Sequence, residues 1–178
     1  MLDTGWNSRY GLFHLFHLFA GQIKVMTTDE KEKAYGLAAK QIEAVISGET
    51  DAVANMANIS AILHDALGSW WTGFYIVKGD ELVLGPFQGP AACTRIGYGR
   101  GVCGTSWKEE RSVVVPDVEQ FPGHIACSSA SRSEVVVPVW NNGKIKGVID
   151  IDSRHLAAFD ECDRRWLEKI AGSIAGAI

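Results

Sequence analysis

The sequence lacks the features of membrane-spanning and nucleic-acid-binding proteins. In its 178 residues, no apolar run reaches the roughly 18 residues that a helix needs to cross a bilayer. The 17 Lys and Arg residues are scattered, and 21 acidic residues give a formal net charge of −4. Binding to a nucleic-acid duplex requires clustered basic side chains instead. We therefore expect a soluble, cytoplasmic protein that binds neither nucleic acid nor membranes.

Cysteine is scarce as well. The chain has only four cysteines, whereas small secreted domains that depend on disulfides are much richer in them. With 47% hydrophobic residues and no internal repeat or linker, the chain has enough apolar side chains to fold around one core. Its cysteines are therefore interpreted as core residues, metal ligands or catalysts.

The first 26 residues differ from the rest. Residues 11–21 are apolar and follow Arg9, which superficially resembles a targeting signal. A single arginine beside Asp3 and two interrupting histidines argue against that interpretation. We expect residues 1–26 to be an N-terminal extension, tag-derived or flexible, and residues 27–178 to form the functional domain.

Helical patterns come first in that domain. Thr27 and Glu30 have the spacing of a capping box, and a second helix is predicted from about Asp51 to Gly68. A short helix is predicted near residues 105–110, and the last helix from about Asp160. The apolar residues at helical spacing in the first helix are Ala34, Leu37, Ala38, Ile42, Val45 and Ile46.

Strand patterns lie between these helices. Asn142-Gly143 is a strong signal for a two-residue hairpin turn, and Lys78-Gly79-Asp80 is a second turn. The predicted strands are 70–77, 81–87, 112–116, 134–140 and 145–151. This order predicts an α+β fold, in which an N-terminal helix pair and a C-terminal helix flank a central, mostly antiparallel sheet.

Three cysteines are predicted to lie in or beside loops, where reactive groups are often placed. These are Cys93, Cys103 and Cys127, each among Gly, Ser, Pro or Thr residues. Buried thiols without a function remain an alternative for all three. Cys162 shares a helical face with Trp166 and is interpreted as a core residue.

Two ligand-binding motifs are considered and set aside. His124-x-x-Cys127 could begin a zinc site, but the gaps of nine and 23 residues between the loop cysteines differ from the close pairs of structural zinc sites. We therefore expect no metal. Gly99-x-Gly101-x-x-Gly104 matches the dinucleotide fingerprint, yet it does not open a βαβ unit.

Carboxylates and aromatic residues could form a pocket. Alternation along a strand places Asp150 and Asp152 on one face, where burial and repulsion would raise at least one pKa. Glu134 could join them, although a solvated strand end is the alternative. Trp71 and Tyr75 also share a face, which more often means core, but Gly73 between them could leave a slot. Such a pocket suits a small molecule with an ammonium group and an apolar stem.

Seven segments resemble, in the same order, those of the free methionine-R-sulfoxide reductases, which are GAF-domain enzymes, and the match as a whole runs from about Glu30 to the C-terminus. They are Trp71–Tyr75, Leu84–Gly89, Ala92-Cys93, Gly99–Thr105, Gly123–Cys127, Ser133-Glu134 and Gly147–Ser153. The blocks around the loop cysteines are the most specific of these. The resemblance implies a GAF-like fold and reduction of free L-methionine-(R)-S-oxide to L-methionine.

The resemblance also implies a role for each matching residue. Cys127 corresponds to the nucleophile, Cys93 to the resolving thiol, and Cys103 to a third cysteine that helps in recycling. Glu134, Asp150 and Asp152 match carboxylates of the substrate site that also serve in catalysis. The other substrate-binding positions are Trp71, Tyr75, Ile125 and Ala126.

The implied chemistry agrees with these residue types. A sulfoxide oxygen leaves well only when it is protonated, so the site needs a thiolate and a carboxylic acid together. We expect a sulfenic acid on Cys127, an intramolecular disulfide with Cys93, and recycling by an external dithiol such as thioredoxin, without a cofactor. Arg132, Arg95 or His124 could favour the thiolate. The resemblance suggests a homodimer, and the alternative function is a non-catalytic GAF sensor of a small molecule.

Overall fold

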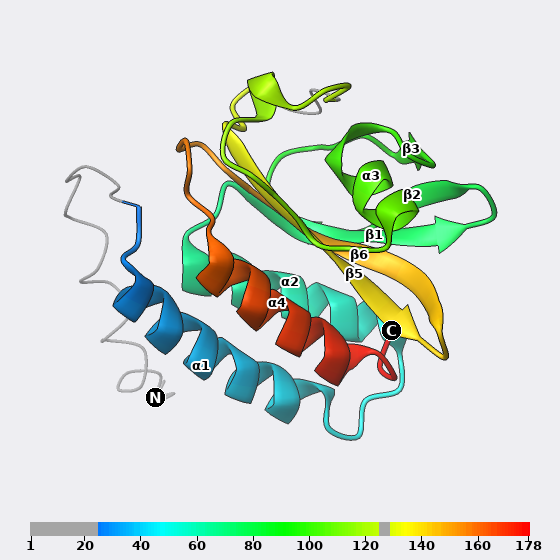
Figure 1. Ribbon diagram of the computed structural model, residues 1–178. Coiled ribbons are helices and arrows are strands. Elements are labelled where there is room, and N and C mark those ends of the chain that lie inside the picture. Colours follow the sequence, from blue (N-terminus) through cyan, green and yellow to red (C-terminus); the bar gives the residue numbers. More distant parts are fainter. Residues whose placement is uncertain (1–24, 125–128) are drawn as a thin grey trace, which may run out of the picture.

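The computed structural model describes residues 25–124 and 129–178, which form a curled antiparallel sheet with helices on both faces (Figure 1). Helices α2 and α4 pack on one face of the sheet, and α1 covers those two helices. Helix α3 lies on the opposite face. The helices are α1 (Thr28–Ile46), α2 (Ala52–Leu67), α3 (Gly101–Glu109) and α4 (Glu161–Ile174).

Side-chain caps fix where the three long helices begin. The Thr27 hydroxyl accepts a bond from the Glu30 amide, and the Glu30 carboxylate accepts one from the Thr27 amide, as the predicted capping box requires. Asp51 caps α2, which ends at Gly68 in the left-handed conformation. Asp160 caps α4. None of the helices in the described residues combines the length and apolar character that a bilayer crossing requires.

The sheet has the strand order β3-β2-β1-β6-β5-β4, and each neighbouring pair is antiparallel. The positive φ angles of Asn142 and Gly143 form the predicted hairpin turn between β5 and β6. The α+β prediction is confirmed. The strands are β1 (Trp71–Lys78), β2 (Glu81–Gln88), β3 (Arg95–Gly97), β4 (Val113–Val115), β5 (Ser133–Asn141) and β6 (Lys144–Ser153).

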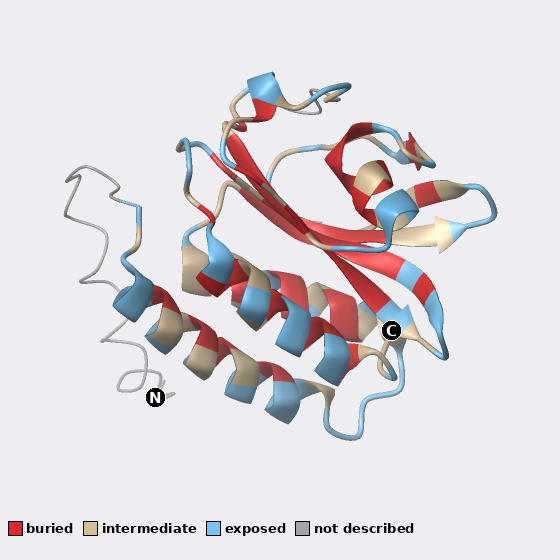
Figure 2. Cartoon of the chain, viewed as in Figure 1, coloured by how far each residue is buried: buried red, intermediate tan, exposed pale blue. Residues whose placement is uncertain are grey.

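Alternate side chains along β5 and β6 pack into two separate hydrophobic cores. Val135 and Ile151 face the core under α2 and α4, whereas Val136 and Val148 face the smaller core under α3. Burial on both faces makes these strands almost continuously buried (Figure 2). The side chains of β6 that follow Val148 at a spacing of two therefore point toward α3.

Two apolar residues of the first predicted helix turn out to be exposed. Leu37 is 65% exposed and Val45 is 41% exposed, while Lys31 and Tyr35 of the same helix are buried. Tyr35 stacks on Trp166 of α4, and Lys31 forms ion pairs with acidic residues at the start of α4. The predicted apolar spacing therefore located only part of the buried face, because such spacing cannot reveal a lysine that finds buried partners.

Candidate active site

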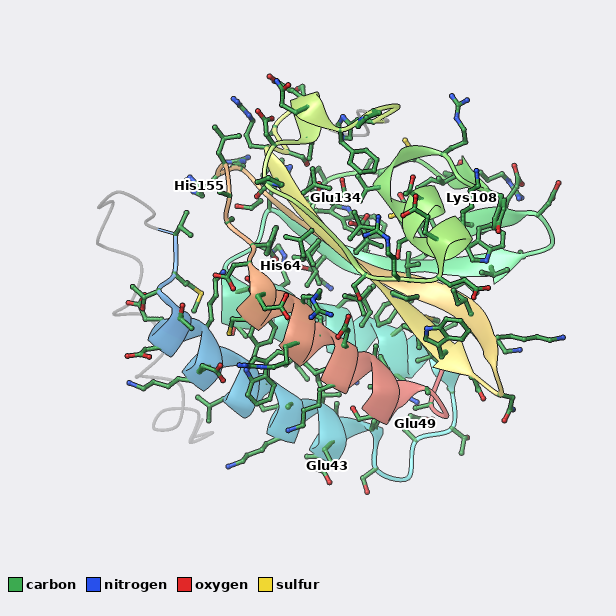
Figure 3. All side chains as sticks on the ribbon, viewed as in Figure 1. Glu43, Glu49, His64, Lys108, Glu134 and His155 are labelled. Carbon is green, nitrogen blue, oxygen red and sulfur yellow. The ribbon has the colours of Figure 1, made fainter. Side chains whose placement is uncertain are left out.

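A hollow opens on the α3 side of the sheet, beside the segment that joins β2 to β3. The hollow spans about 560 Å³ when the solvent space at its open mouth is included. Figure 3 labels Glu134 on this side of the sheet. Six predicted site residues line the hollow: Trp71, Tyr75, Cys103, Glu134, Asp150 and Asp152.

Antiparallel pairing brings the three carboxylates together. Glu134 of β5 lies directly opposite Asp152 of β6, and Asp150 lies two residues before Asp152 on the same face. On the other side of β6, Trp71 of β1 lies opposite Asp152. The predicted clustering of the three carboxylates beside the aromatic residues is therefore confirmed.

Burial keeps these carboxyl groups from ionising in their usual range. Glu134 and Asp150 are each 6% exposed. Burial first, and then the charges of neighbouring aspartates, raise the pKa of both well above ordinary values. Burial also raises the pKa of Asp152 to about 6, against the effect of a hydrogen bond with Ser131. The raised pKa values of Glu134 and Asp150 favour carboxylic acid protons in the pocket, whereas Asp152, with a pKa of about 6, favours carboxylate charge at neutral pH.

The described lining provides no permanent positive charge to balance this cluster. It contains neither lysine nor arginine among residues 25–124 and 129–178. His124 is the basic residue there, but burial lowers the pKa of its imidazole, so the ring is largely neutral at pH 7. The pocket therefore favours a ligand that brings its own positive charge.

The raised pKa values of these carboxyl groups predict how the stability of the protein depends on pH. The folded protein retains carboxyl protons that the unfolded chain releases near pH 4, so this cluster lowers the free energy of unfolding as the pH rises. Asp152, with a folded-state pKa of about 6, costs about 2–3 kcal/mol when ionised. We expect Asp152→Asn to be about 2 kcal/mol more stable than the wild type at pH 8. At pH 4 the two should have nearly equal stability.

Urea unfolding at the two pH values measures this difference. Asp80→Asn, in the exposed turn between β1 and β2, is the matched control and should shift stability equally at both pH values. A gain for Asp152→Asn that is the same at pH 4 and pH 8 would contradict the assignment.

Cys103 lies on helix α3 rather than in the predicted loop. Positive φ angles at Gly99 and Gly101 turn the chain sharply after β3, so the helix begins earlier than the sequence pattern indicated. The free thiol is 3% exposed, and its Sγ lies 4.0 Å from Oε1 of Glu134. Burial and the charges of Asp150 and Glu134 raise the pKa of this thiol. It is therefore protonated at neutral pH, unlike an attacking thiolate.

Gly104 explains how α3 can bring Cys103 so close to the sheet. A Cβ atom at Gly104 would lie 2.5 Å from the Gly97 carbonyl oxygen and 3.2 Å from the Gly99 nitrogen. Both are backbone atoms, which cannot move aside like the end of a side chain. The Gly-x-Gly-x-x-Gly match therefore reflects close helix packing in an antiparallel sheet, and rejecting a dinucleotide site is consistent with this topology.

We expect Gly104→Ala to destabilise the protein by about 1–3 kcal/mol, because the added methyl group pushes α3 away from β3. Gly172→Ala is the matched control, since Gly172 lies within α4 and a Cβ atom added there would have open space around it. That change should stabilise by up to about 1 kcal/mol through helix propensity. Chemical unfolding of both variants is the measurement, and equal stabilities would refute the packing argument.

The aromatic wall differs from the expected slot. Trp71 stacks between Tyr75 and Phe87, with ring centroids 6.0 and 5.3 Å away. A Cβ at Gly73 would lie 2.4 Å from Cβ of Phe87 and 2.7 Å from the Trp71 ring. The expectation of a ligand slot at Gly73 is therefore wrong, because Trp71 and Phe87 fill that space. The open space lies beyond the rings, toward the carboxylates.

Hydrogen bonds from the two lining aromatics hold the segment that carries Cys93. The Trp71 indole donates to the Pro90 carbonyl at 3.1 Å, and the Tyr75 hydroxyl donates to the Cys93 carbonyl at 2.9 Å. Cys93 is half-buried in the loop between β2 and β3 and is disulfide-bonded, in contrast to the free thiols of Cys103 and Cys162. The loop prediction is confirmed for Cys93.

Three predicted site residues, Cys127, Ile125 and Ala126, lie outside the described residues. Their roles remain predictions, as does the pairing of Cys127 with Cys93. The described chain reaches His124 and resumes at Ser129, and His124 and Ser131 both line the pocket.

Among the three basic residues proposed to assist the thiolate, only His124 lines the pocket. Arg95 instead forms an exposed ion pair of 2.9 Å with Glu81. Arg132 is not among the lining residues, and its Nε is buried without a hydrogen-bond partner in the described part of the chain. Sequence reasoning did not find Ser131, although a hydroxyl next to a predicted acidic cluster was the available signal.

Comparison with known proteins agrees with this geometry. A GAF domain model matches residues 56–178. The free methionine-R-sulfoxide reductase of Escherichia coli is 42% identical over 145 residues, covering 81% of this chain and 88% of that protein. The enzyme of the same name from Saccharomyces cerevisiae is 44% identical, covering 72% and 77%. The chain belongs to the free methionine-R-sulfoxide reductase family of GAF-domain proteins.

A solved structure of this family shows the same fold with a ligand bound. The free methionine-R-sulfoxide reductase of Neisseria meningitidis, in complex with its substrate, matches with a TM-score of 0.78 and 54% identity. The match covers 80% of this chain and 88% of that one. The family and GAF fold inferred from the sequence are therefore confirmed.

Proposed function

We propose that this protein reduces free L-methionine-(R)-S-oxide to L-methionine by thiol chemistry. The observation that carries the proposal is the pocket itself, where buried carboxyl groups with raised pKa values adjoin an aromatic wall in a chain of this family. The protonated acids suit a sulfoxide oxygen, and the rings suit the substrate's methyl and methylene groups.

In the proposed mechanism, the Cys127 thiolate attacks the sulfoxide sulfur while a carboxylic acid of the pocket protonates the oxygen. The oxygen passes to Cys127, whose sulfur is oxidised to a sulfenic acid as methionine is released. The Cys93 thiol then displaces water from the sulfenic acid, forming a disulfide. An external dithiol, for which we propose thioredoxin, reduces this disulfide by exchange, with Cys103 as an auxiliary thiol. The electrons come from that dithiol, so no bound cofactor is needed.

The carboxyl groups divide into two roles by their pKa values. Glu134 and Asp150, with pKa values raised well above the ordinary range, are suited to donate the proton. Asp152, with a pKa of about 6, is largely ionised at neutral pH and suited to pair with the α-ammonium group. A homodimer, a cytoplasmic location and a functional domain that starts at residue 27 remain part of the proposal.

The proposed ammonium contact predicts selectivity for the free amino acid. N-acetyl-methionine sulfoxide has no positive charge, so its binding would leave the Asp152 carboxylate unpaired in a buried site. We expect its kcat/KM to be lower by about 10²-fold or more, measured with a dithiol as reductant. Equal turnover of the free and acetylated sulfoxides would refute this use of the carboxylates.

The proposed function is tested by turnover of free methionine-R-sulfoxide with wild type, Cys127→Ser and Cys162→Ser. We expect Cys127→Ser to fall to background. Cys162→Ser is the matched control, because Cys162 lies on α4 on the opposite face of the sheet, and it should retain full activity. Full activity of Cys127→Ser would remove the nucleophile, and substrate binding without turnover by the wild type would favour a sensor. Mass spectrometry after one turnover should find Cys93 linked to Cys127.

A further inference from the structure

Three potential metal ligands face one another inside the pocket. The Sγ atom of Cys103 and one carboxylate oxygen each from Glu134 and Asp150 lie within 4.8 Å of one another. Two ligands of a tetrahedral zinc ion, with bonds of about 2.0–2.3 Å, lie about 3.5 Å apart. The three ligand atoms therefore need to approach one another by only about 1 Å to bind such an ion.

Asp150 gives an independent indication that this cluster accepts a cation. Its Oδ1 is buried and has no hydrogen-bond partner among the described residues, although the side chain lines the pocket. A buried acceptor left without a donor typically costs about 1–3 kcal/mol. Since neither lysine nor arginine belongs to the described lining, any positive charge that pairs with these carboxylates would come from a ligand.

We infer that the reduced pocket binds a divalent cation of the Zn²⁺ class through Cys103, Glu134 and Asp150, in competition with the substrate. The thiol decides the class of ion, because thiolates bind Zn²⁺ far better than Mg²⁺ or Ca²⁺, which prefer oxygen ligands. The competition rests on the proposed function, since the same carboxylates would hold the substrate. The metal site itself does not depend on that function.

This site differs from the zinc motif that the sequence suggested. The spacing argument concerned His124, Cys127 and the gaps between the loop cysteines, which contain no close pair of ligands. The three ligands come instead from α3, β5 and β6, which the sheet register and the packing of α3 bring together. A bound ion would block substrate binding as long as the thiols are reduced.

The test uses Co²⁺ as a spectroscopic substitute for Zn²⁺ on the fully reduced protein, free of added thiols. A thiolate-to-cobalt charge-transfer band should appear in the near ultraviolet, and added Zn²⁺ should remove it. The band should persist in the double variant Cys93→Ser/Cys127→Ser and in Cys162→Ser. The band should disappear in Cys103→Ser. In Asp150→Asn, the apparent affinity for Co²⁺ measured from the band should fall at least tenfold. Circular dichroism establishes that each variant is folded.

The outcomes separate this site from the alternatives. Absence of the band in the wild type, or its persistence in Cys103→Ser, would overturn the inference. Loss of the band in the Cys93→Ser/Cys127→Ser variant would do the same, by assigning the metal to those loop thiols.

Competition is measured in Cys127→Ser, which is not expected to turn over. Free methionine-R-sulfoxide should displace Co²⁺ from this variant, and coexistence of the two ligands would refute the shared site. The cobalt band requires no catalysis. Absence of reductase activity would therefore overturn the proposed function alone, and absence of the band would overturn the metal site alone.

Discussion

Replacing Glu134 by glutamine is expected to lower kcat for free methionine-R-sulfoxide by about 10²- to 10⁴-fold, the usual contribution of a positioned general acid. Glutamine keeps the shape of the side chain and can still hydrogen-bond the sulfoxide oxygen. It has no acidic proton to transfer, whereas burial and the charges of Asp150 and Asp152 raise the pKa of Glu134 well above its usual range and so favour its protonated form. We therefore expect KM to change little.

The comparison with Asp152→Asn separates proton donation from substrate binding. Asp152, with a pKa of about 6, is proposed to pair with the ammonium group, so its variant should mainly raise KM. Glu119→Gln is the control, because Glu119 is exposed on the short 3₁₀ helix Val118–Gln120. Steady-state kinetics of the three variants provides the readout. A purely structural role for Glu134 would lower stability and raise KM without this separation.

The buried ion pair between α1 and α4 leads to the second expected result, a loss of about 3–5 kcal/mol of stability in Lys31→Met. The Lys31 ammonium is 3% exposed and contacts the carboxylates of Asp163 and Asp160, the latter at 2.9 Å. Burial alone would lower the pKa of Lys31, but hydrogen bonds and charges from the two aspartates raise it overall. Removing the cation leaves the Asp163 carboxylate, 1% exposed, buried without its counter-charge.

Lys33→Met provides the matched control, since Lys33 lies two residues further along α1 and is exposed. Its substitution should alter the free energy of unfolding by less than about 0.5 kcal/mol. Urea denaturation of both variants at neutral pH gives the comparison. Similar stabilities would show that the ion pair contributes little and that apolar packing holds α1 in place.

The sequence predicted the elements whose signals are local. Thr27, Asp51 and Asp160 cap helices where they were expected, and Asn142-Gly143 turns the hairpin. Alternation alone placed Asp150 and Asp152 on one face of β6, because a strand has a fixed period of two. These are properties of a few neighbouring residues, so no knowledge of the tertiary structure was needed.

Features that depend on contacts between distant segments could not be predicted in this way. Cys103 appeared to belong to a loop, because Gly104 weakens a helical pattern. The need for glycine at position 104 follows only from its close contact with the Gly97 carbonyl in the folded structure. Gly73 suggested an open slot that Trp71 and Phe87 fill. The burial of Lys31 likewise depends on α4, more than 120 residues away in the sequence.

Strand β6 contributes to the hydrophobic core with one face and to the pocket with the other. Its odd-numbered residues, Ile149 and Ile151, belong to one hydrophobic core, and its even-numbered aspartates line the pocket on the opposite face. A shift in pairing by a single residue would move acids into the apolar interior and isoleucines into the pocket. We therefore expect an insertion or deletion within β6 to disrupt the apolar core and the pocket together, whereas a single substitution reaches only one of the two faces.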